Sequence, residues 1–162
     1  MLIRLTAKMA KKLKINQLPT VNDDPGPYLE WYSNVFRANR VQYIITTEAK
    51  SLLTIVMYGR GITDENTFIR NWLGLLRDYL LDIGGEFILQ RIIGPQTDEF
   101  SFAKTASRSI LGSMNDMVDM SKFMLRVKDM SPWDLADFTN QTPFSALDYR
   151  NPFEAFKDLK IK

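Results

Sequence analysis

The chain of 162 residues contains no histidine and no cysteine. Histidine is the one side chain whose unperturbed pKa lies near physiological pH, and cysteine is the readiest thiolate nucleophile and soft metal ligand. Their absence excludes a Ser–His–Asp triad, a Cys–His pair, a zinc site with imidazole or thiolate ligands, and any disulfide. Catalysis would have to use carboxylates, Lys, Arg, Tyr, Ser or Thr. We expect no cofactor and no metal site.

Long apolar runs are absent as well. No run approaches the ~20 residues that cross a bilayer, and the basic start of the chain, residues 1–15, lacks the apolar core and cleavage site of a secretory signal. The hydrophobic fraction of 45% and the charged fraction of 25% are ordinary for a globular protein. We therefore expect a single domain over residues 1–162. The lack of disulfides and of membrane segments favours a cytoplasmic location.

The net charge is only +2, but the positive charge is concentrated near the amino end. Residues 1–60 hold nine Lys and Arg against four Asp and Glu, whereas residues 61–162 hold twelve against fifteen. Most of the excess lies in one stretch, at Arg4, Lys8, Lys11, Lys12 and Lys14. Such a cluster can contact nucleic-acid phosphates or an acidic partner, or it can be the solvated face of a helix. The residue types leave both interpretations open.

Apolar alternation and β-branched or aromatic content predict five strands. They cover Leu2–Leu5 and residues 31–37, 41–46, 52–58 and 99–104. Residues 38–40 are short enough for a hairpin between the second and third of these strands.

Two long helices are predicted, over residues 64–83 and over Arg108–Val127. The first has Thr63 as its expected N-cap and ends at Gly84-Gly85. Shorter helical segments are expected at residues 7–14, 134–138 and 153–159, and residues 86–93 fit either a short helix or a strand. The prediction is an α+β fold in which a small, mainly antiparallel sheet packs against two long helices. A C-terminal tail rich in proline and aromatic residues would lie on the outside.

The helix over Arg108–Val127 has one apolar side and one unusually small, polar side. The polar side carries Arg108, Ser109, Gly112, Ser113, Asn115, Asp116 and Asp119. A glycine inside a helix costs ~1 kcal/mol relative to alanine. Two interpretations remain open. Either this side is a pocket in which Arg108 holds an anion while Asn115 and Asp116 orient it or hold a cation, or it packs tightly against the sheet or the tail.

Three stretches resemble an uncharacterised family of small bacterial proteins with a domain of unknown function. They are the opening strand and helix start at residues 1–6, the stretch 31–34 followed by Asn39-Arg40, and residues 107–116. The third carries the R-S-x-L-G-S-M-N-D signature. The family pattern has Asn where this chain has Ser107, and either residue can cap a helix. The resemblance implies no activity or cofactor. It implies a small accessory protein, such as those of mobile elements, in regulation or interaction.

The leading hypothesis is a non-catalytic binding or regulatory protein. Its surface would be the polar side of the second long helix or the basic cluster Lys8, Lys11 and Lys12. A protein is the expected partner, with nucleic acid as the alternative at the basic amino end.

The competing hypothesis is an enzyme that acts on a phosphorylated or nucleotide substrate. Arg108 would clamp the anion, Asp116 would be a base or cation ligand, and Ser109 or Ser113 would orient the substrate. A third hypothesis is a subunit that assembles through a strand edge or a Met-rich face. The sequence leaves the oligomeric state open.

Overall fold

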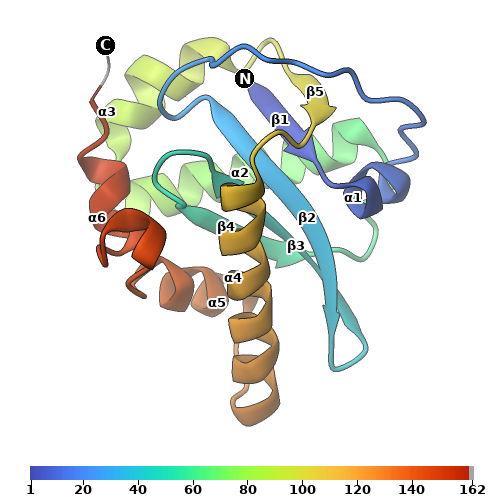
Figure 1. Ribbon diagram of the computed structural model, residues 1–162, viewed down its shortest axis with the longest axis vertical. Helices are drawn as coiled ribbons and strands as arrows, with labels where there is room; N and C mark the ends of the chain where they lie inside the picture. The colour runs from blue at the N-terminus through green and yellow to red at the C-terminus, as the bar shows by residue number, and fades with distance from the viewer. Residues whose placement is uncertain (161–162) are drawn as a thin grey trace.

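The computed structural model describes residues 1–160 and contains one mixed sheet of five strands in the order β4-β3-β2-β1-β5 (Figure 1). The strands are β1 (Leu2–Leu5), β2 (Glu30–Ala38), β3 (Val41–Glu48), β4 (Thr54–Tyr58) and β5 (Ser101–Lys104). The ladders β2–β3 and β3–β4 are antiparallel, whereas β1 pairs in parallel with both β2 and β5. The antiparallel ladders are the longer ones, so the sheet is mainly antiparallel, with a parallel edge.

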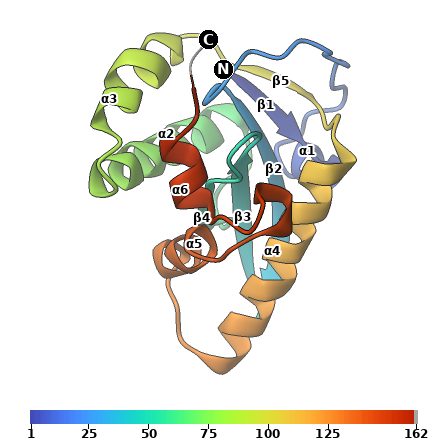
Figure 2. The same ribbon diagram turned by 60° about the vertical axis from the view of Figure 1, so that its left-hand side comes forward.

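The helices cover both faces of this sheet. They are α1 (Ala7–Lys12), α2 (Glu65–Asp82), α3 (Glu86–Ile88), α4 (Arg108–Val127), α5 (Pro132–Asn140) and α6 (Pro152–Lys157). The long helices α2 and α4 lie on opposite faces (Figures 1 and 2). The α+β prediction is confirmed. None of the helices within residues 1–160 is apolar over a length that would cross a membrane.

Side-chain contacts fix which helix covers which face. Trp31 of β2 meets Trp72 of α2 edge to face, with ring centroids 5.2 Å apart. The next residue along β2, Tyr32, points to the other face because strand side chains alternate. Its register partner Thr47 lies 3.8 Å from the sulfur of Met117 in α4. The expected apolar stripe of α2 is buried, and it packs against the face of the sheet that carries Trp31.

Several predicted boundaries are wrong. Asp64, not Thr63, caps α2, because its carboxylate accepts the backbone N–H of Thr67 at 2.8 Å. The helix α1 ends two residues early, at Lys12, and Lys14 has a left-handed backbone with φ of 59°. Residues 86–93 form α3 followed by a π-helical turn, and no strand.

The C-terminal tail is more helical than predicted and is held to the sheet. Pro132 opens α5 beside a reciprocal Ser131–Asp134 capping box. At the end of α5, Asn140 accepts the N–H of Thr54 and donates to its carbonyl, both at 2.8 Å. This side chain therefore pairs with β4 as a neighbouring strand would. Figure 2 shows α5 and α6 together on one side of the molecule.

The second half of β2 has a neighbouring strand on one side only. The ladder between β1 and β2 ends at the pair Leu5–Ser33, where the chain leaves the sheet and enters α1. Residues 34–38 therefore pair with β3 and present their other edge outward. This open edge lies beside α1 and α4, and both helices contact β2.

Candidate functional site

The lysines of α1 point outward because the helix buries its apolar side. Met9 and Leu13 are in the core, whereas Lys8 and Lys11 are exposed and Lys12 is half-buried. A hollow of about 950 Å³ begins at these lysines and reaches across β2 to α4. It is lined by Lys8, Lys11, Lys12, Asn34, Val35, Phe36, Arg37, Gln42, Asn115, Val118, Asp119 and Lys122.

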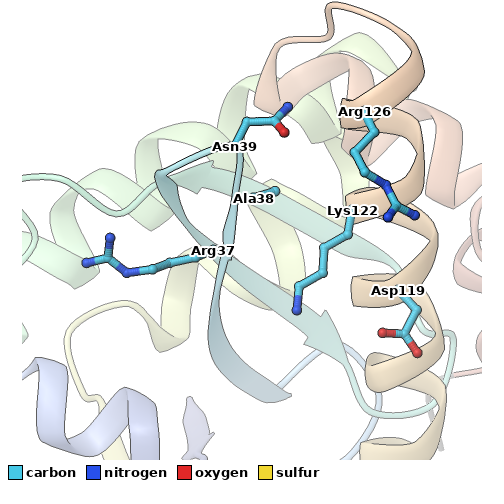
Figure 3. Close-up of a pocket in the computed structure, with 6 residues that line it drawn as sticks. All are labelled: Arg37, Ala38, Asn39, Asp119, Lys122 and Arg126. Atoms are coloured by element: carbon cyan, nitrogen blue, oxygen red, sulfur yellow. The ribbon is translucent and has the colours of Figure 1, made fainter.

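A second hollow of about 480 Å³ continues from the first toward the tip of the β2–β3 hairpin (Figure 3). It is lined by Arg37, Ala38, Asn39, Asp119, Lys122 and Arg126. In Figure 3, Lys122 extends from α4 toward β2, whereas Arg37 leaves β2 on the side away from α4. We refer to the two hollows together as the basic groove.

The basic groove carries six cationic side chains and one carboxylate, Asp119. The cations are Lys8, Lys11, Lys12, Arg37, Lys122 and Arg126. The ion pairs found within residues 1–160 are Arg4–Glu30, Lys50–Asp24 and Arg150–Asp158, so none of the six cations is in an ion pair there. The positive charge of the groove therefore outweighs the single negative charge of Asp119, and within residues 1–160 it is not matched by ion pairs.

Lys12 shows how closely these cations are placed. Its ammonium group donates a hydrogen bond to the side-chain carbonyl of Gln42, which comes from β3. Partial burial lowers the pKa of Lys12 from its ordinary value, and the positive charge of Arg37 lowers it further. A bound anion between Lys12 and Arg37 would relieve this repulsion.

Polar groups of the open edge complete the groove. The side-chain oxygen of Asn34 accepts from the hydroxyl of Thr6 and from the N–H of Val35, both at 2.8 Å. The amide nitrogens of Asn34 and Asn115 make no hydrogen bond within the described chain. The groove thus offers amide donors as well as cations to a ligand.

The polar side of α4 is divided by the structure. Arg108, Ser109, Gly112, Asn115, Asp116 and Asp119 are exposed, and of these only Asn115 and Asp119 line the basic groove. The structure thus brings Asn115 together with the α1 lysines.

Three further candidate residues, Ser113, Arg108 and Asp116, lie outside the groove. Ser113 is only 8% exposed and belongs to the buried side with Met114, so its assignment to the polar side of the helix is wrong. Arg108 and Asp116 are two turns apart, ~12 Å along the helix axis, and line neither of the two hollows. The arrangement gives neither of them a role at the groove.

Gly112 does not pack tightly against anything. A Cβ built at this position meets no atom within 4 Å, and the residue is exposed. Of the two interpretations left open, the structure gives no support at Gly112 to tight packing against the sheet or the tail. Gly74 in α2 has the same open surroundings.

Arg4 is the one residue of the predicted basic cluster that the fold buries. It is 3% exposed, forms an ion pair with Glu30, and donates to the carbonyls of Val21 and Lys104. Its charge is therefore matched inside the protein, and it holds the segment before β2 and the strand β5 against β1.

Sequence reasoning missed the groove residues of β2 and of the second half of α4. Arg37 and Lys122 lie 85 positions apart, and only the sheet register and the placement of α4 bring them to one groove. Nothing in the local sequence indicates that exposed cations at the end of a strand and on the last turns of a helix lie close together in the fold. Within residues 1–160, no group of three or more Asp and Glu is arranged to hold a metal ion.

Comparison with known proteins identifies a family. A family model described as a domain of unknown function, DUF6933, matches residues 2–155. No curated protein and no solved structure matches the chain. The predicted resemblance to a family of unknown function is thereby confirmed, while the residue signature and the bacterial origin stay predictions.

Proposed function

The chain belongs to the DUF6933 family, and we propose that this member is a non-catalytic binding protein whose basic groove receives an acidic segment of a partner protein. The observation that carries the proposal is the set of six cations along one continuous groove, none of them in an ion pair within residues 1–160. Like charges held close together repel, and an acidic ligand converts this repulsion into attraction.

A protein partner is favoured over nucleic acid by the aromatic side chains. Proteins that bind single-stranded nucleic acid stack its bases on exposed rings. The exposed rings of this protein are Tyr58, Phe87, Phe123 and Tyr149, and none of them lines the basic groove. The groove offers amides, lysines and arginines, which suit carboxylates and peptide groups.

The enzyme hypothesis has no comparable observation behind it. It requires Arg108 and Asp116 to act on one substrate, but both side chains lie on the exposed surface of α4 outside the groove. We therefore place the function in binding, in the cytoplasm as the composition suggests.

The test is a charge reversal across the groove. The double variant Arg37→Glu/Lys122→Glu replaces one cation on each side of it, and Arg70→Glu/Arg77→Glu makes the same change in net charge on the exposed surface of α2. Fluorescence anisotropy with a labelled octaglutamate peptide, over a salt series, gives the affinity of each. We expect the groove variant to weaken binding at least tenfold and the α2 variant to change it less than twofold.

Two results would contradict the proposal. One is a wild-type protein that does not bind the peptide at low salt. The other is an equal loss of affinity in both double variants, because it would mean that net charge and not the groove determines binding. Circular dichroism of both variants checks that each is folded.

A further inference from the structure

The open edge of β2 forms the floor of the basic groove. Val35, Phe36 and Arg37 line the larger hollow, and Arg37 and Ala38 line the smaller one. The five residues 34–38 extend about 17 Å at the usual rise of ~3.4 Å per residue. A ligand in the groove would therefore lie along a stretch of strand that lacks a neighbour.

The hydrogen bonds at the two ends of β2 show which backbone groups face this edge. The carbonyl of Ser33 accepts from Thr6 on the β1 side, and the carbonyl of Glu30 accepts from Ala49 on the β3 side. Backbone groups alternate along a strand. Val35 and Arg37 therefore direct their N–H and C=O groups toward the open edge.

Within residues 1–160, only one of these four groups is already hydrogen-bonded. The N–H of Val35 donates to the side chain of Asn34, whereas the carbonyl of Val35 and both backbone groups of Arg37 face the groove. A short extended peptide could pair with these three groups. Nucleic acid offers no matching row of alternating donors and acceptors.

The cations lie on both sides of the edge. Arg37 and Lys12 belong to the α1 side, because Lys12 contacts Gln42, the register partner of Arg37. Lys122 extends toward the edge from α4, on the other side (Figure 3). A strand added at this edge would place successive side chains alternately beside these two groups of cations.

We infer that the partner segment binds as an additional strand along residues 34–38 of β2, and that it carries acidic side chains on both of its faces. This inference rests on the proposed function of the basic groove. A second copy of this chain is disfavoured as the occupant, because its own groove cations would be brought against those of the first copy.

A peptide modified only in its backbone tests the inference. An octaglutamate that is N-methylated at every residue keeps its charge but loses the N–H groups of both edges, so no shift of register restores them. We expect it to bind the wild-type protein at least tenfold more weakly than the unmodified peptide. Equal affinity would overturn strand addition while leaving the charge-driven proposed function intact. Tighter binding of a single-stranded DNA of equal charge would also overturn it.

A pair of variants at one position provides the matching test on the protein. Arg37→Pro and Arg37→Ala both remove the charge, but only proline removes the outward N–H and crowds the edge. Proline is tolerated on edge strands where the N–H does not enter the ladder. We expect Arg37→Pro to bind at least fivefold more weakly than Arg37→Ala. Equal affinity of the two folded variants would count against strand addition.

Hydrogen exchange of the wild-type protein decides the matter if the proline variant does not fold. We expect the Arg37 amide to become at least tenfold more protected when octaglutamate binds, and not when inorganic polyphosphate binds. Unchanged exchange at saturating peptide would overturn the inference. Light scattering that shows a dimer of wild-type protein, lost in Arg37→Ala, would overturn it in favour of pairing between two copies.

Discussion

At the residue scale, Glu48 is the clearest case of a buried polar side chain that the fold requires. Its side chain is fully buried, and its two carboxylate oxygens accept four hydrogen bonds. The donors are the backbone N–H groups of Tyr28, Lys50 and Ser51 and the hydroxyl of Ser51. This one side chain therefore satisfies hydrogen-bond donors both in the turn between β3 and β4 and in the segment that leads into β2.

The variant Glu48→Gln tests this role. One oxygen becomes an NH₂ group, and whichever way the amide is turned this donor faces a backbone N–H donor in a buried site, either that of Tyr28 or those of Lys50 and Ser51. We expect the free energy of unfolding to fall by about 3 kcal/mol, measured by urea denaturation. The exposed Glu65→Gln is the matched control and should change it by less than about 0.5 kcal/mol. A loss below about 1 kcal/mol for Glu48→Gln would show that the site tolerates the amide.

At the element scale, α4 carries a helix-weakening glycine for which the described fold gives no packing reason. Gly112 and Gly74 both lie in helix interiors, with open space where the methyl group of an alanine would lie. We expect Gly112→Ala and Gly74→Ala each to raise the free energy of unfolding by about 0.5–1 kcal/mol. Thermal and urea unfolding measure both. Destabilisation by either alanine would mean that its helix needs the flexibility of glycine.

Gly112→Ala also tests whether the ligand binds in the basic groove or on the outer side of α4. Gly112 does not line the basic groove, so the variant should keep wild-type affinity for octaglutamate within twofold. A tenfold loss of affinity in Gly112→Ala, with the affinity of Gly74→Ala unchanged, would indicate that the binding surface lies nearer Arg108 and Asp116.

The elements themselves were largely predictable, whereas their boundaries were less so. The stripe that contains Phe68, Trp72 and Leu76 predicts α2 because helical periodicity and burial coincide there. The cap at Asp64 was missed because Thr63 and Asp64 are both good capping residues, and only the backbone geometry chooses between them. Ser113 was misplaced because it lies at the border between the two sides of α4, where a small residue fits either.

The candidate site was predictable only in part, for a reason of topology. The α1 lysines and Asn115 were identified from local composition, and the structure places them in one groove. Arg37, Lys122 and Arg126 were not, because their meeting depends on where β1 ends and how α4 crosses β2. The open edge likewise follows from a ladder of only four residue pairs, which no local pattern encodes.

At the scale of the whole molecule, contacts between distant parts of the chain hold the C-terminal tail against the rest of the fold. The hydroxyl of Tyr28 lies 3.0 Å from the carbonyl of Phe156 and 2.9 Å from that of Leu159, and its ring packs edge to face on Phe156. Burial, and after it the negative charges of Glu48 and Asp158, raise the pKa of Tyr28 to about 12. The neutral hydroxyl is the form that can donate to the tail.

The raised pKa of Tyr28 makes a contribution to stability that is lost at alkaline pH. An unfolded tyrosine ionises near pH 10, whereas folded Tyr28 holds its proton to about pH 12. The folded state therefore binds more protons between these values, and its contribution to stability is full below pH 10 and lost as the pH rises through 12. We expect Tyr28→Phe to flatten the fall of unfolding free energy between pH 10 and 12, measured by urea denaturation at each pH. Tyr58→Phe, which changes an exposed ring, is the control. An identical slope in wild type and Tyr28→Phe would mean that the tail does not depend on this hydroxyl.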